Sequence, residues 1–484
     1  ADKNSPLAAS GSTEGRQGFF DSLTLNSLRK EGLLVSQKTY DAIKPVKHAH
    51  GGVKAPHKKF TAEQATVKMP PPDKVYIAMQ QHIGAPCLPT VKKGDKVFVG
   101  SVVGDSDKYV SAPIHSSVSG TVEGMTKIQL PSGIKTDAVI IASDGLMTPD
   151  PELKPHPVTT VDELLKAAHD SGLVGLGGAG FPTYIKLTPN KDKPIDTVII
   201  NAAECEPFIT ADYREVIENS ENLMEGVFLL LDVLKPQQII IAVEDNKPAA
   251  IAKLEKIAGD RRDKEHRVMI MKLRSHYPQG AEKVLVYTAT GRKIPQGGLP
   301  ADVGCIVMNI TSVSKLYEYI TTGMPLVSKR LTVDGAVLKK SAENVIVPIG
   351  TAVDEVIDFV GEPEREVTKV LMGGPMMGLC ISDGQIPVLK QNNAIILFGA
   401  NKDSTLRYKE TACIRCGRCG EVCPMSLLPT AIEKYSRFKD IKALERAGVL
   451  TCMECGSCAF TCPAHRPLVQ YMRLAKEIYK KGDN

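Results

Sequence analysis

Cysteine is scattered through most of this chain and becomes periodic near its end. Eight cysteines there form two runs of the pattern C-x2-C-x2-C-x3-C-P: Cys413, Cys416, Cys419 and Cys423 before Pro424, and Cys452, Cys455, Cys458 and Cys462 before Pro463. The short steps let one loop place three thiolates around a corner of an iron–sulfur cube, while the longer step and the proline direct the fourth thiolate away. The spacing therefore predicts two [4Fe–4S] clusters.

The fourth cysteine of each run is expected to bind the other cluster. The predicted ligand sets are Cys413, Cys416, Cys419 and Cys462 for one cluster, and Cys452, Cys455, Cys458 and Cys423 for the other. Structural zinc is an alternative, but zinc sites usually use paired Cys-x2-4-Cys steps rather than triplets with an outlying fourth cysteine. Disulfides are disfavoured because nothing indicates secretion and the other four cysteines lie far apart.

The composition is that of a multidomain globular protein. The 484 residues are enough for three or four domains, and no apolar run approaches the roughly 18 residues of a membrane span. The formal charge of +5 is small, and basic residues are interleaved with acidic ones, so no nucleic-acid-binding face is indicated. Because cluster assembly requires a reducing compartment, we expect the chain in the cytoplasm.

The chain before the cysteine runs begins with an extension, residues 1–45, and a segment of predicted strands, residues 46–150. Residues 1–45 are interpreted as a flexible N-terminal extension, with a docking segment as the alternative. From residue 46, short strands alternate with Gly-Asp and Gly-Ser turns, and the stretch from Val91 to Val122 resembles half of a biotinyl or lipoyl carrier domain. The hairpin that carries the modified lysine in those domains is missing. Residues 46–150 are therefore predicted to form an unmodified barrel-sandwich domain, with Lys108 an ordinary surface lysine.

Helical and strand periods alternate between residues 151 and 324, as in an α/β domain. Gly175, Gly177 and Gly180 match G-x-G-x-x-G, but the dinucleotide fingerprint needs a strand before the glycines and a helix after them. Here a predicted helix precedes the glycines and Pro182 follows them, so the standard dinucleotide fold is disfavoured. The glycines still provide bare backbone that can lie against a flat ring or a phosphate.

Polar residues follow the first predicted strand of this α/β domain. The stretch DTVIINAAECEPFITADYR is interpreted as a buried strand that runs off its C-terminal end into Asn201, Glu204 and Glu206. Ligands of open α/β sheets bind at the carboxyl ends of the strands. The sequence therefore indicates a ligand site at this end of the sheet.

Several motifs together carry a family resemblance. GLGGAGFPTYIK, NAAECEP, YPQGAE and MNITS are similar to the flavin- and NADH-binding motifs of the flavoprotein subunit of respiratory complex I, in the same order. The chain from about residue 50, including GGVKAP, QQHIGAP, SAPIHSSVSG, LMGGPMMG and the two-cluster tail, resembles the RnfC family, the NADH-oxidising subunits of the ion-translocating Rnf complexes. Residues 1–45 lie outside the resemblance.

The resemblance implies the remaining domains. It implies a β-grasp module of the soluble-ligand-binding (SLBB-like) type, which we interpret as a structural spacer, and a helical two-cluster ferredoxin domain. The expected fold is multidomain, α/β and α+β: an extension (1–45), a barrel-sandwich domain (46–150), a complex I flavoprotein-like α/β FMN/NADH domain (151–324), the β-grasp module (325–400) and the ferredoxin domain (401–484).

The resemblance also implies an FMN site. Its residues would be Gly177, Gly178, Gly180, Lys186, Asn201, Glu204, Tyr277, Gly280, Asn309 and Ser312. The glycines would let the backbone approach the cofactor, and Lys186 would place a positive charge beside the flavin or its phosphate. Asn309 and Ser312, at the start of a helix, would bind the phosphate together with free backbone N–H groups.

NADH recognition carries over to three residues. Phe181 would provide a stacking face, and Glu206 and Glu282 would accept hydrogen bonds from ribose hydroxyls or the amide. An acid near the ribose would also disfavour the extra phosphate of NADPH. The sequence departs from the complex I pattern at Ala203 and Ala281, where that pattern has acids.

The function that the resemblance implies is electron transfer in a membrane-bound Rnf-type complex. Such a protein oxidises NADH through FMN and relays single electrons through two [4Fe–4S] clusters towards ferredoxin, while membrane and ferredoxin-like iron–sulfur partner subunits translocate ions. It would lie at the cytoplasmic face of the inner membrane. One alternative is an RnfC-like cobalamin reductase of a microcompartment, against which the C-terminal position of the clusters argues. Another is a wiring subunit without its own NADH site.

Overall fold

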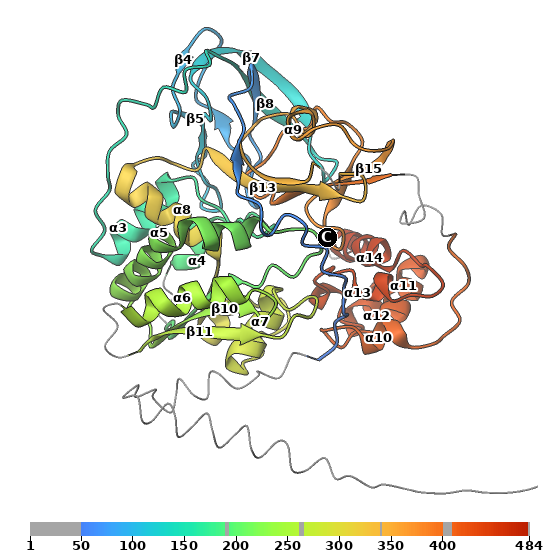
Figure 1. Ribbon diagram of the computed structural model, residues 1–484. Helices are drawn as coiled ribbons and strands as arrows, with labels where there is room; N and C mark the ends of the chain where they lie inside the picture. The colour runs from blue at the N-terminus through green and yellow to red at the C-terminus, as the bar shows by residue number, and fades with distance from the viewer. Residues whose placement is uncertain (1–49, 189–192, 261–265, 339–340, 400–408, 483–484) are drawn as a thin grey trace, which may run out of the picture. The chain divides into compact units, whose positions relative to one another are not determined.

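The computed structural model describes residues 50–188, 193–260, 266–338, 341–399 and 409–482 (Figure 1). The N-terminal extension, with its alternative role in docking, lies outside these residues. The described strands form four sheets, which correspond to the successive folds expected from the sequence, followed by a helical segment. Among the described residues, no helix combines the length and the apolar character needed to cross a bilayer.

Two antiparallel sheets form the barrel-sandwich part of the chain. One sheet has the order β2-β8-β7-β4 and the other β3-β5-β6. Their strands are β2 (Lys74–Ala78), β3 (Leu88–Pro89), β4 (Lys96–Val97), β5 (Val102–Asp105), β6 (Ile114–His115), β7 (Gly120–Gln129) and β8 (Lys135–Ser143). Alternate side chains of the strands, such as those of Val75, Ile77, Val139 and Ile141, enclose one apolar core. Lys108 lies exposed on this domain.

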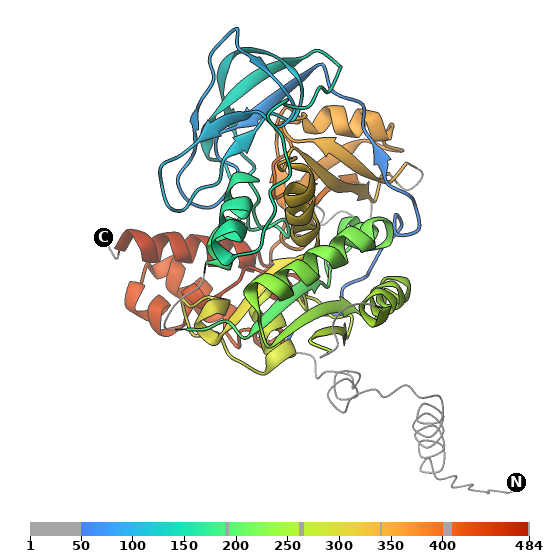
Figure 2. The ribbon, with the colours of Figure 1, turned by 90° about the vertical axis from the view of Figure 1, so that its left-hand side faces the viewer.

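The α/β domain is built on a fully parallel sheet with the order β11-β10-β9-β12. Its strands are β9 (Thr197–Ala202), β10 (Gln238–Glu244), β11 (Val268–Leu273) and β12 (Cys305–Asn309). The strands are nearly continuous apolar runs because helices cover both faces of the sheet (Figure 2). The covering helices include α5 (Ala211–Leu234), α6 (Pro248–Asp260), α7 (Glu282–Thr290) and α8 (Ile310–Thr322).

The glycine loop lies between two helices rather than after a strand. Helix α3 (Val161–Asp170) begins at Thr160, whose side chain and that of Glu163 form a capping box. The loop follows α3 and leads through Pro182 into the short helix α4 (Thr183–Leu187). This order matches the interpretation of the glycines as bare backbone and not as the dinucleotide fingerprint.

A mixed six-stranded sheet occupies the segment where the β-grasp module is expected. Its order is β1-β14-β13-β17-β15-β16, and helix α9 (Val353–Val360) packs into its core. The strands are β1 (Val67–Lys68), β13 (Ser328–Gly335), β14 (Glu343–Pro348), β15 (Val367–Met372), β16 (Leu379–Ile381) and β17 (Ala394–Gly399). Strand β1 comes from the segment predicted as the barrel-sandwich domain and pairs with β14.

Five helices of 4 to 15 residues lie in the described part of the C-terminal segment, coloured red in Figure 1. They are α10 (Arg418–Glu421), α11 (Pro429–Phe438), α12 (Ile441–Arg446), α13 (Ser457–Phe460) and α14 (Leu468–Gly482). The two cysteine runs have the same backbone course. Arg415 and Glu454 have positive φ at equivalent positions of the two runs. Gly417 has a φ of +80° and Gly456 a φ of +82°, and each of these glycines precedes a four-residue helix. The repeated spacing of the cysteines is thus accompanied by a repeated local fold.

Candidate cofactor sites

The carboxyl ends of β9 and β12 meet where the strand order reverses. The chain passes from β9 to β10 and β11 on one side and returns to β12 on the other, and ligands of open α/β sheets bind at such a point. Asn201 and Asn309 lie there as register partners on the two neighbouring strands. The Oδ1 atom of Asn309 accepts hydrogen bonds from the backbone N–H groups of Thr311 (2.9 Å) and Ser312 (3.3 Å). Two predicted site residues are thus neighbours at the switch point.

The glycine loop rests on the beginning of α8. The hydroxyl of Ser312 accepts a hydrogen bond from Leu176 N (3.2 Å) and lies 3.3 Å from Val174 O, to which it donates. A Cβ at Gly177 would lie 3.5 Å from Asn309 Nδ2, whereas a Cβ at Gly178 would meet nothing within 4 Å. The loop is therefore fixed at its start and open at Gly178, which fits a flat ring lying against it.

The loop that contains Tyr277 and Gly280 closes against the end of β9. Asn201 Nδ2 donates to Gly280 O (2.8 Å), and Asn201 Oδ1 accepts from Ala203 N (3.1 Å). The predicted site residues Asn201 and Gly280 are thus in contact. The side-chain amide of Asn201 orients the opposite wall of the candidate flavin site.

Lys186 and Glu282 form an ion pair. Their charged atoms lie 2.8 Å apart, and Lys186 Nζ also donates to Val307 O (3.3 Å). Both side chains are partly exposed. The sequence assigned Lys186 to the flavin and Glu282 to the nicotinamide nucleotide, whereas here each neutralises the other. Phe181, the predicted stacking residue, is half-buried at the end of the glycine loop, where its carbonyl accepts from Gly175 N (2.8 Å).

Glu204 is held at the start of α5. Its carboxylate accepts from Asp212 N (2.6 Å) and Tyr213 N (3.3 Å). Burial raises the pKa of Glu204 to about 7, although the nearby Lys59 ammonium opposes the shift. Lys59 itself donates to the backbone carbonyls of Glu204 and Glu206 at 2.8 Å each. In this structure Glu204 therefore caps a helix, and Lys59 fixes the turn that carries both acids.

Glu206 connects the α/β domain to the six-stranded sheet. Its carboxylate accepts from the backbone N–H groups of Met376 (3.0 Å) and Met377 (2.9 Å), in the turn that the LMGGPMMG motif forms. Burial raises the pKa of Glu206 to about 7, and these two N–H groups oppose the shift. The predicted contact of Glu206 with a ribose therefore stays a prediction, because the structure engages the carboxylate elsewhere.

Residues 51–53 join the candidate flavin site to the cysteine runs. Gly52 N donates to Val422 O (2.7 Å), and Val53 pairs with Tyr277 through two backbone hydrogen bonds (2.7 and 3.0 Å). The hydroxyl of Tyr277 donates to Cys455 O (2.6 Å). Sequence reasoning noted GGVKAP only as part of the resemblance. Its adjacent glycines were the available signal, since close approach of two backbones requires them.

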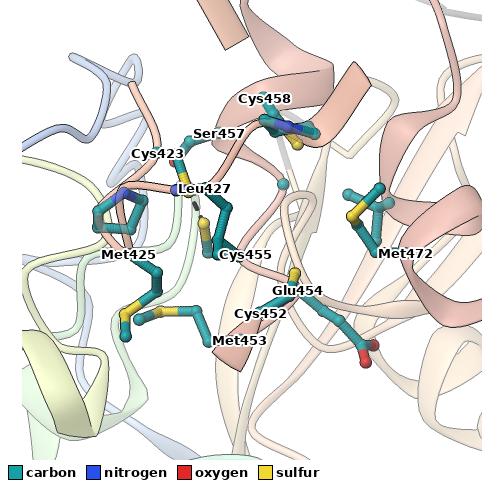
Figure 3. A pocket seen from close by; sticks show the side chains of 14 residues that line it. Cys423, Met425, Leu427, Cys452, Met453, Glu454, Cys455, Ser457, Cys458 and Met472 are labelled. Carbon is teal, nitrogen blue, oxygen red and sulfur yellow. Dashed lines mark hydrogen bonds between the residues drawn. The ribbon is translucent and has the colours of Figure 1, made fainter. Parts of the chain in front are cut away.

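One predicted cluster ligand set lines a single cavity (Figure 3). Cys423, from the first run, lines it together with Cys452, Cys455 and Cys458 from the second. Backbone N–H groups point at two of the sulfurs, Leu427 N at Cys423 (3.3 Å) and Glu454 N at Cys452 (3.4 Å). The Glu454 carboxylate pairs with Lys476 (2.6 Å) and Arg473 (2.9 Å). This thiol-lined, otherwise largely apolar cavity fits a [4Fe–4S] cluster.

The other predicted ligand set is more exposed. Cys413 and Cys416 lie at the surface, while Cys419 and Cys462 are half-buried. Burial raises the pKa of Cys419, and the nearby Cys462 thiol contributes in the same direction, which places these two thiols close together. Among the described residues, no three His, Cys, Asp or Glu side chains converge as ligands of one metal ion. The set of Cys423, Cys452, Cys455 and Cys458 instead surrounds a cavity.

Comparison with known proteins agrees with this geometry. The family described as the Nuo51 FMN-binding domain matches residues 168–318, the RnfC barrel sandwich hybrid domain matches residues 47–146, and the 4Fe-4S dicluster domain matches residues 405–463. These matches confirm the predicted FMN and iron–sulfur cofactors and the kinds of fold that bind them. A solved structure of an NAD+-reducing [NiFe]-hydrogenase aligns with 64% of this chain and 62% of its own, at 20% identity and a TM-score of 0.46.

Two curated relatives extend over most of the chain. It is 40% identical to the C component of the proton-translocating ferredoxin:NAD(+) oxidoreductase complex of Clostridium ljungdahlii, across 87% of this chain and 91% of that protein. It is also 40% identical to the C component of the Na(+)-translocating ferredoxin:NAD(+) oxidoreductase complex of Acetobacterium woodii, across 89% of this chain and 97% of that protein. With this identity over nearly the whole of both relatives, the chain belongs to the family of C components of ferredoxin:NAD(+) oxidoreductase complexes, the RnfC family.

Proposed function

We propose that this chain is the NADH-oxidising electron-transfer subunit of an Rnf-type complex. It takes electrons from NADH at the FMN site of the α/β domain and passes them singly through two [4Fe–4S] clusters towards ferredoxin. Bound FMN supplies the exchange between the two-electron chemistry of NADH and the one-electron chemistry of the clusters. The relatives whose names describe ferredoxin:NAD(+) oxidoreductase complexes support this proposal.

The observation that carries the proposal is the direct contact between the two cofactor regions. Tyr277, in the wall of the candidate flavin site, donates its hydroxyl hydrogen to the carbonyl of Cys455, a predicted cluster ligand, at 2.6 Å. Val53, Tyr277 and Cys455 also share a small apolar core. Electron transfer between protein cofactors requires that they lie close together. The side chain of Tyr277 and its hydrogen bond to the carbonyl of Cys455 form a short path between the two sites.

The exposure of the cysteines indicates the order in which the two clusters would carry electrons. Cys423 and Cys455 are buried beside the α/β domain, whereas Cys413 and Cys416 are exposed. The cluster of Cys452, Cys455, Cys458 and Cys423 would therefore exchange electrons with the flavin. The cluster of Cys413, Cys416, Cys419 and Cys462 would exchange them with a partner subunit.

The chain's own residues position the nucleotides. Gly177, Gly178 and Gly180 keep the backbone bare against the flavin, and Asn201 holds Gly280 in the opposite wall. Asn309 and Ser312 shape the start of α8 for the phosphate. Phe181, Glu206 and Glu282 are the proposed contacts of NADH, and Glu206 and Glu282 would exchange their present partners for the nucleotide.

We assign the chain to the cytoplasmic face of the inner membrane, held there by membrane and iron–sulfur partner subunits. Ion translocation would take place in those membrane partners. The two relatives with equal identity are named for different ions, protons in one and Na+ in the other. The similarity therefore does not select the coupled ion.

A wiring subunit without its own NADH site is the second candidate. It is favoured by Ala203 and Ala281, which stand where the complex I pattern has acids, and by the engagement of Glu206 and Glu282 with protein groups. The test is anaerobic purification followed by flavin, iron and sulfide analysis and by addition of NADH. We expect about one FMN and about eight iron atoms per chain, with bleaching of the flavin by NADH. Full cluster content without flavin, or flavin that NADH does not bleach, would favour the wiring function.

A further inference from the structure

Three lysine side chains are buried in the described part of the chain. Lys247, Lys329 and Lys390 are 6%, 3% and 1% exposed, respectively. A buried ammonium group is costly unless it is paired or hydrogen-bonded. Because an ammonium group has three N–H donors, the number of acceptors around each nitrogen tells how completely its cost is compensated.

The three lysines differ in this respect. Lys247 has three acceptors, Ala203 O (2.6 Å), Glu244 Oε2 (2.9 Å) and Asn246 Oδ1 (3.3 Å). Lys390 has two, Pro113 O (2.6 Å) and Gly172 O (2.7 Å).

Lys329 has the weakest set. Among the described residues, its ammonium donates only to Leu176 O, at 3.3 Å, and takes part in no ion pair, because the nearby carboxylate of Glu215 pairs with Arg330 instead. Two donors of a buried cation are therefore available to a further acceptor. Burial lowers the pKa of Lys329 to about 8, with Asp212 and Glu215 opposing the shift, so most of the population is charged at neutral pH.

The position of Lys329 is as informative as its incomplete set of hydrogen-bond acceptors. The residue lies in β13, a strand of the six-stranded sheet (Figure 1). Its side chain reaches Leu176 in the glycine loop. Leu176 N is in turn bonded to Ser312 at the start of α8. Asp212, the carboxylate that most favours the charged form of Lys329, accepts hydrogen bonds from Asn309 Nδ2 and from Thr311 Oγ1, both at 2.7 Å.

The unpaired charge therefore lies beside the helix start to which the flavin phosphate was assigned from the sequence. Lys186, the cation expected near the flavin, is neutralised by Glu282. Lys329 also lies outside residues 168–318, the segment matched by the FMN-binding family. The segment that we interpreted from sequence as a structural spacer thus places a charge beside the candidate flavin site.

We propose that Lys329 is a binding residue for the phosphate of the flavin mononucleotide, and that the six-stranded sheet thereby completes the flavin site. This inference rests on the proposed flavin function. A phosphate monoester offers several charged acceptor oxygens, which suit an ammonium with two free donors. The proposal predicts that the chain prefers FMN to riboflavin, which lacks the phosphate, and that Lys329 is responsible for the preference.

The test compares the affinities of FMN and riboflavin for the full chain, with its clusters retained and its flavin removed. Lys329→Met keeps the length of the side chain and removes the charge. We expect its Kd for FMN to rise about 10- to 100-fold, as for loss of a charge-assisted hydrogen bond, while its Kd for riboflavin stays near that of the wild type. Lys329→Arg should keep a preference for FMN, and Lys329→Gln is the substitute if the methionine variant does not fold.

Lys390→Met is the matched control, because it removes a buried lysine whose ammonium already has two short hydrogen bonds. It should reduce stability without changing the ratio of the two affinities. If Lys329→Met weakened FMN and riboflavin equally, Lys329 would be a structural residue and the inference would be wrong. Equal binding of both flavins by the wild type would also overturn it while leaving the flavin function intact. Binding of neither flavin would instead overturn the flavin function itself.

Discussion

Glu204 and Glu206 are partly buried residues, and burial raises the pKa of each carboxyl group to about 7. In the unfolded chain the pKa of a glutamate is about 4.3. Between these values the unfolded chain has released its protons while the folded chain retains them. Folding stability is therefore highest below about pH 4 with respect to these two groups, and it falls as the pH rises towards 7.

We predict that Glu206→Gln reduces this pH dependence. The amide does not titrate, so Tm should fall less between about pH 4.5 and 7 than in the wild type, whatever the change in Tm at a single pH. Thermal unfolding across this range measures the slope, and the exposed Glu152 supplies the control Glu152→Gln. An unchanged slope would mean that the Glu206 carboxyl titrates normally in the folded chain.

The same variant, Glu206→Gln, should keep FMN and raise the KM for NADH. An unchanged KM would remove Glu206 from the nicotinamide site.

Gly178 is the open point of the glycine loop. Its φ is +125°, and a side chain there would meet no protein atom within 4 Å, so it would fill the space proposed for the flavin. We expect Gly178→Val to lose FMN and to keep its iron. Gly94→Val is a matched control, since Gly94 has a φ of +93° and equally open surroundings in the barrel-sandwich domain. Stoichiometric flavin in the Gly178 variant would move the flavin site elsewhere.

Cys423 tests the exchange of ligands between the two cysteine runs. It lines the cavity of Cys452, Cys455 and Cys458, so Cys423→Ala should damage that cluster and leave the cluster of Cys413 intact. Iron analysis should show a partial loss, and electron paramagnetic resonance of the reduced protein should identify the surviving cluster. Cys380→Ala, at an exposed cysteine outside the runs, should lose neither. Loss of the cluster of Cys413 instead would refute the assignment.

At the scale of elements, the segment of residues 51–53 determines how the cysteine runs meet the α/β domain. Gly52 has a φ of +86°, and a Cβ there would lie 2.5 Å from Tyr277 O. The segment can therefore lie between Val422 and Tyr277 only if this position has no side chain. The tight fit explains two adjacent glycines before an extended stretch.

We predict that Gly52→Ala slows electron transfer from flavin to clusters. The added methyl group must displace Tyr277 or His276, and Tyr277 holds Cys455. Stopped-flow spectroscopy should show flavin reduction by NADH at a normal rate, followed by slower cluster reduction. Gly133→Ala is the control because Gly133 has the same φ of +86° and nothing within 4 Å. Equal cluster reduction in both variants would show that the segment does not set the contact.

At the scale of the whole molecule, the proposed function separates what this chain does alone from what its complex does. The isolated chain should oxidise NADH with ferricyanide, because that reaction needs only the flavin and an exposed electron exit. Low-potential ferredoxins lie at about −400 mV, below the nicotinamide couple, so their reduction by NADH requires energy from outside the redox pair. We assign that energy to the ion gradient across the membrane partners.

We therefore expect little net ferredoxin reduction when purified chain, NADH and ferredoxin are mixed anaerobically without membranes. The absorbance of ferredoxin reports the extent of reduction, and ferricyanide reduction in a parallel sample shows that the chain is active. Extensive ferredoxin reduction without a second exergonic acceptor would contradict the proposal. It would favour a self-contained bifurcating reductase.

The sequence by itself determined the features that depend on neighbouring residues. The cysteine spacing indicated two clusters because a loop of fixed length can present three thiolates only at certain steps. The apolar strands, the helix before the glycines and the glycine loop are equally local, and the structure contains all three. Motif order was enough to identify the family and its cofactors, which the comparisons confirm.

Only the tertiary structure decided which of these features contact one another. The pairs Lys186–Glu282, Lys329–Leu176 and Glu206–Met376 join residues 96, 153 and 170 positions apart. No periodicity in the sequence encodes such contacts, because they depend on how separate sheets pack. A lysine in a strand can face solvent, pair with an acid or remain unpaired at a cofactor site. Packing against the glycine loop left the ammonium of Lys329 with a single acceptor, and that is why its proposed role came from the structure and not from the sequence.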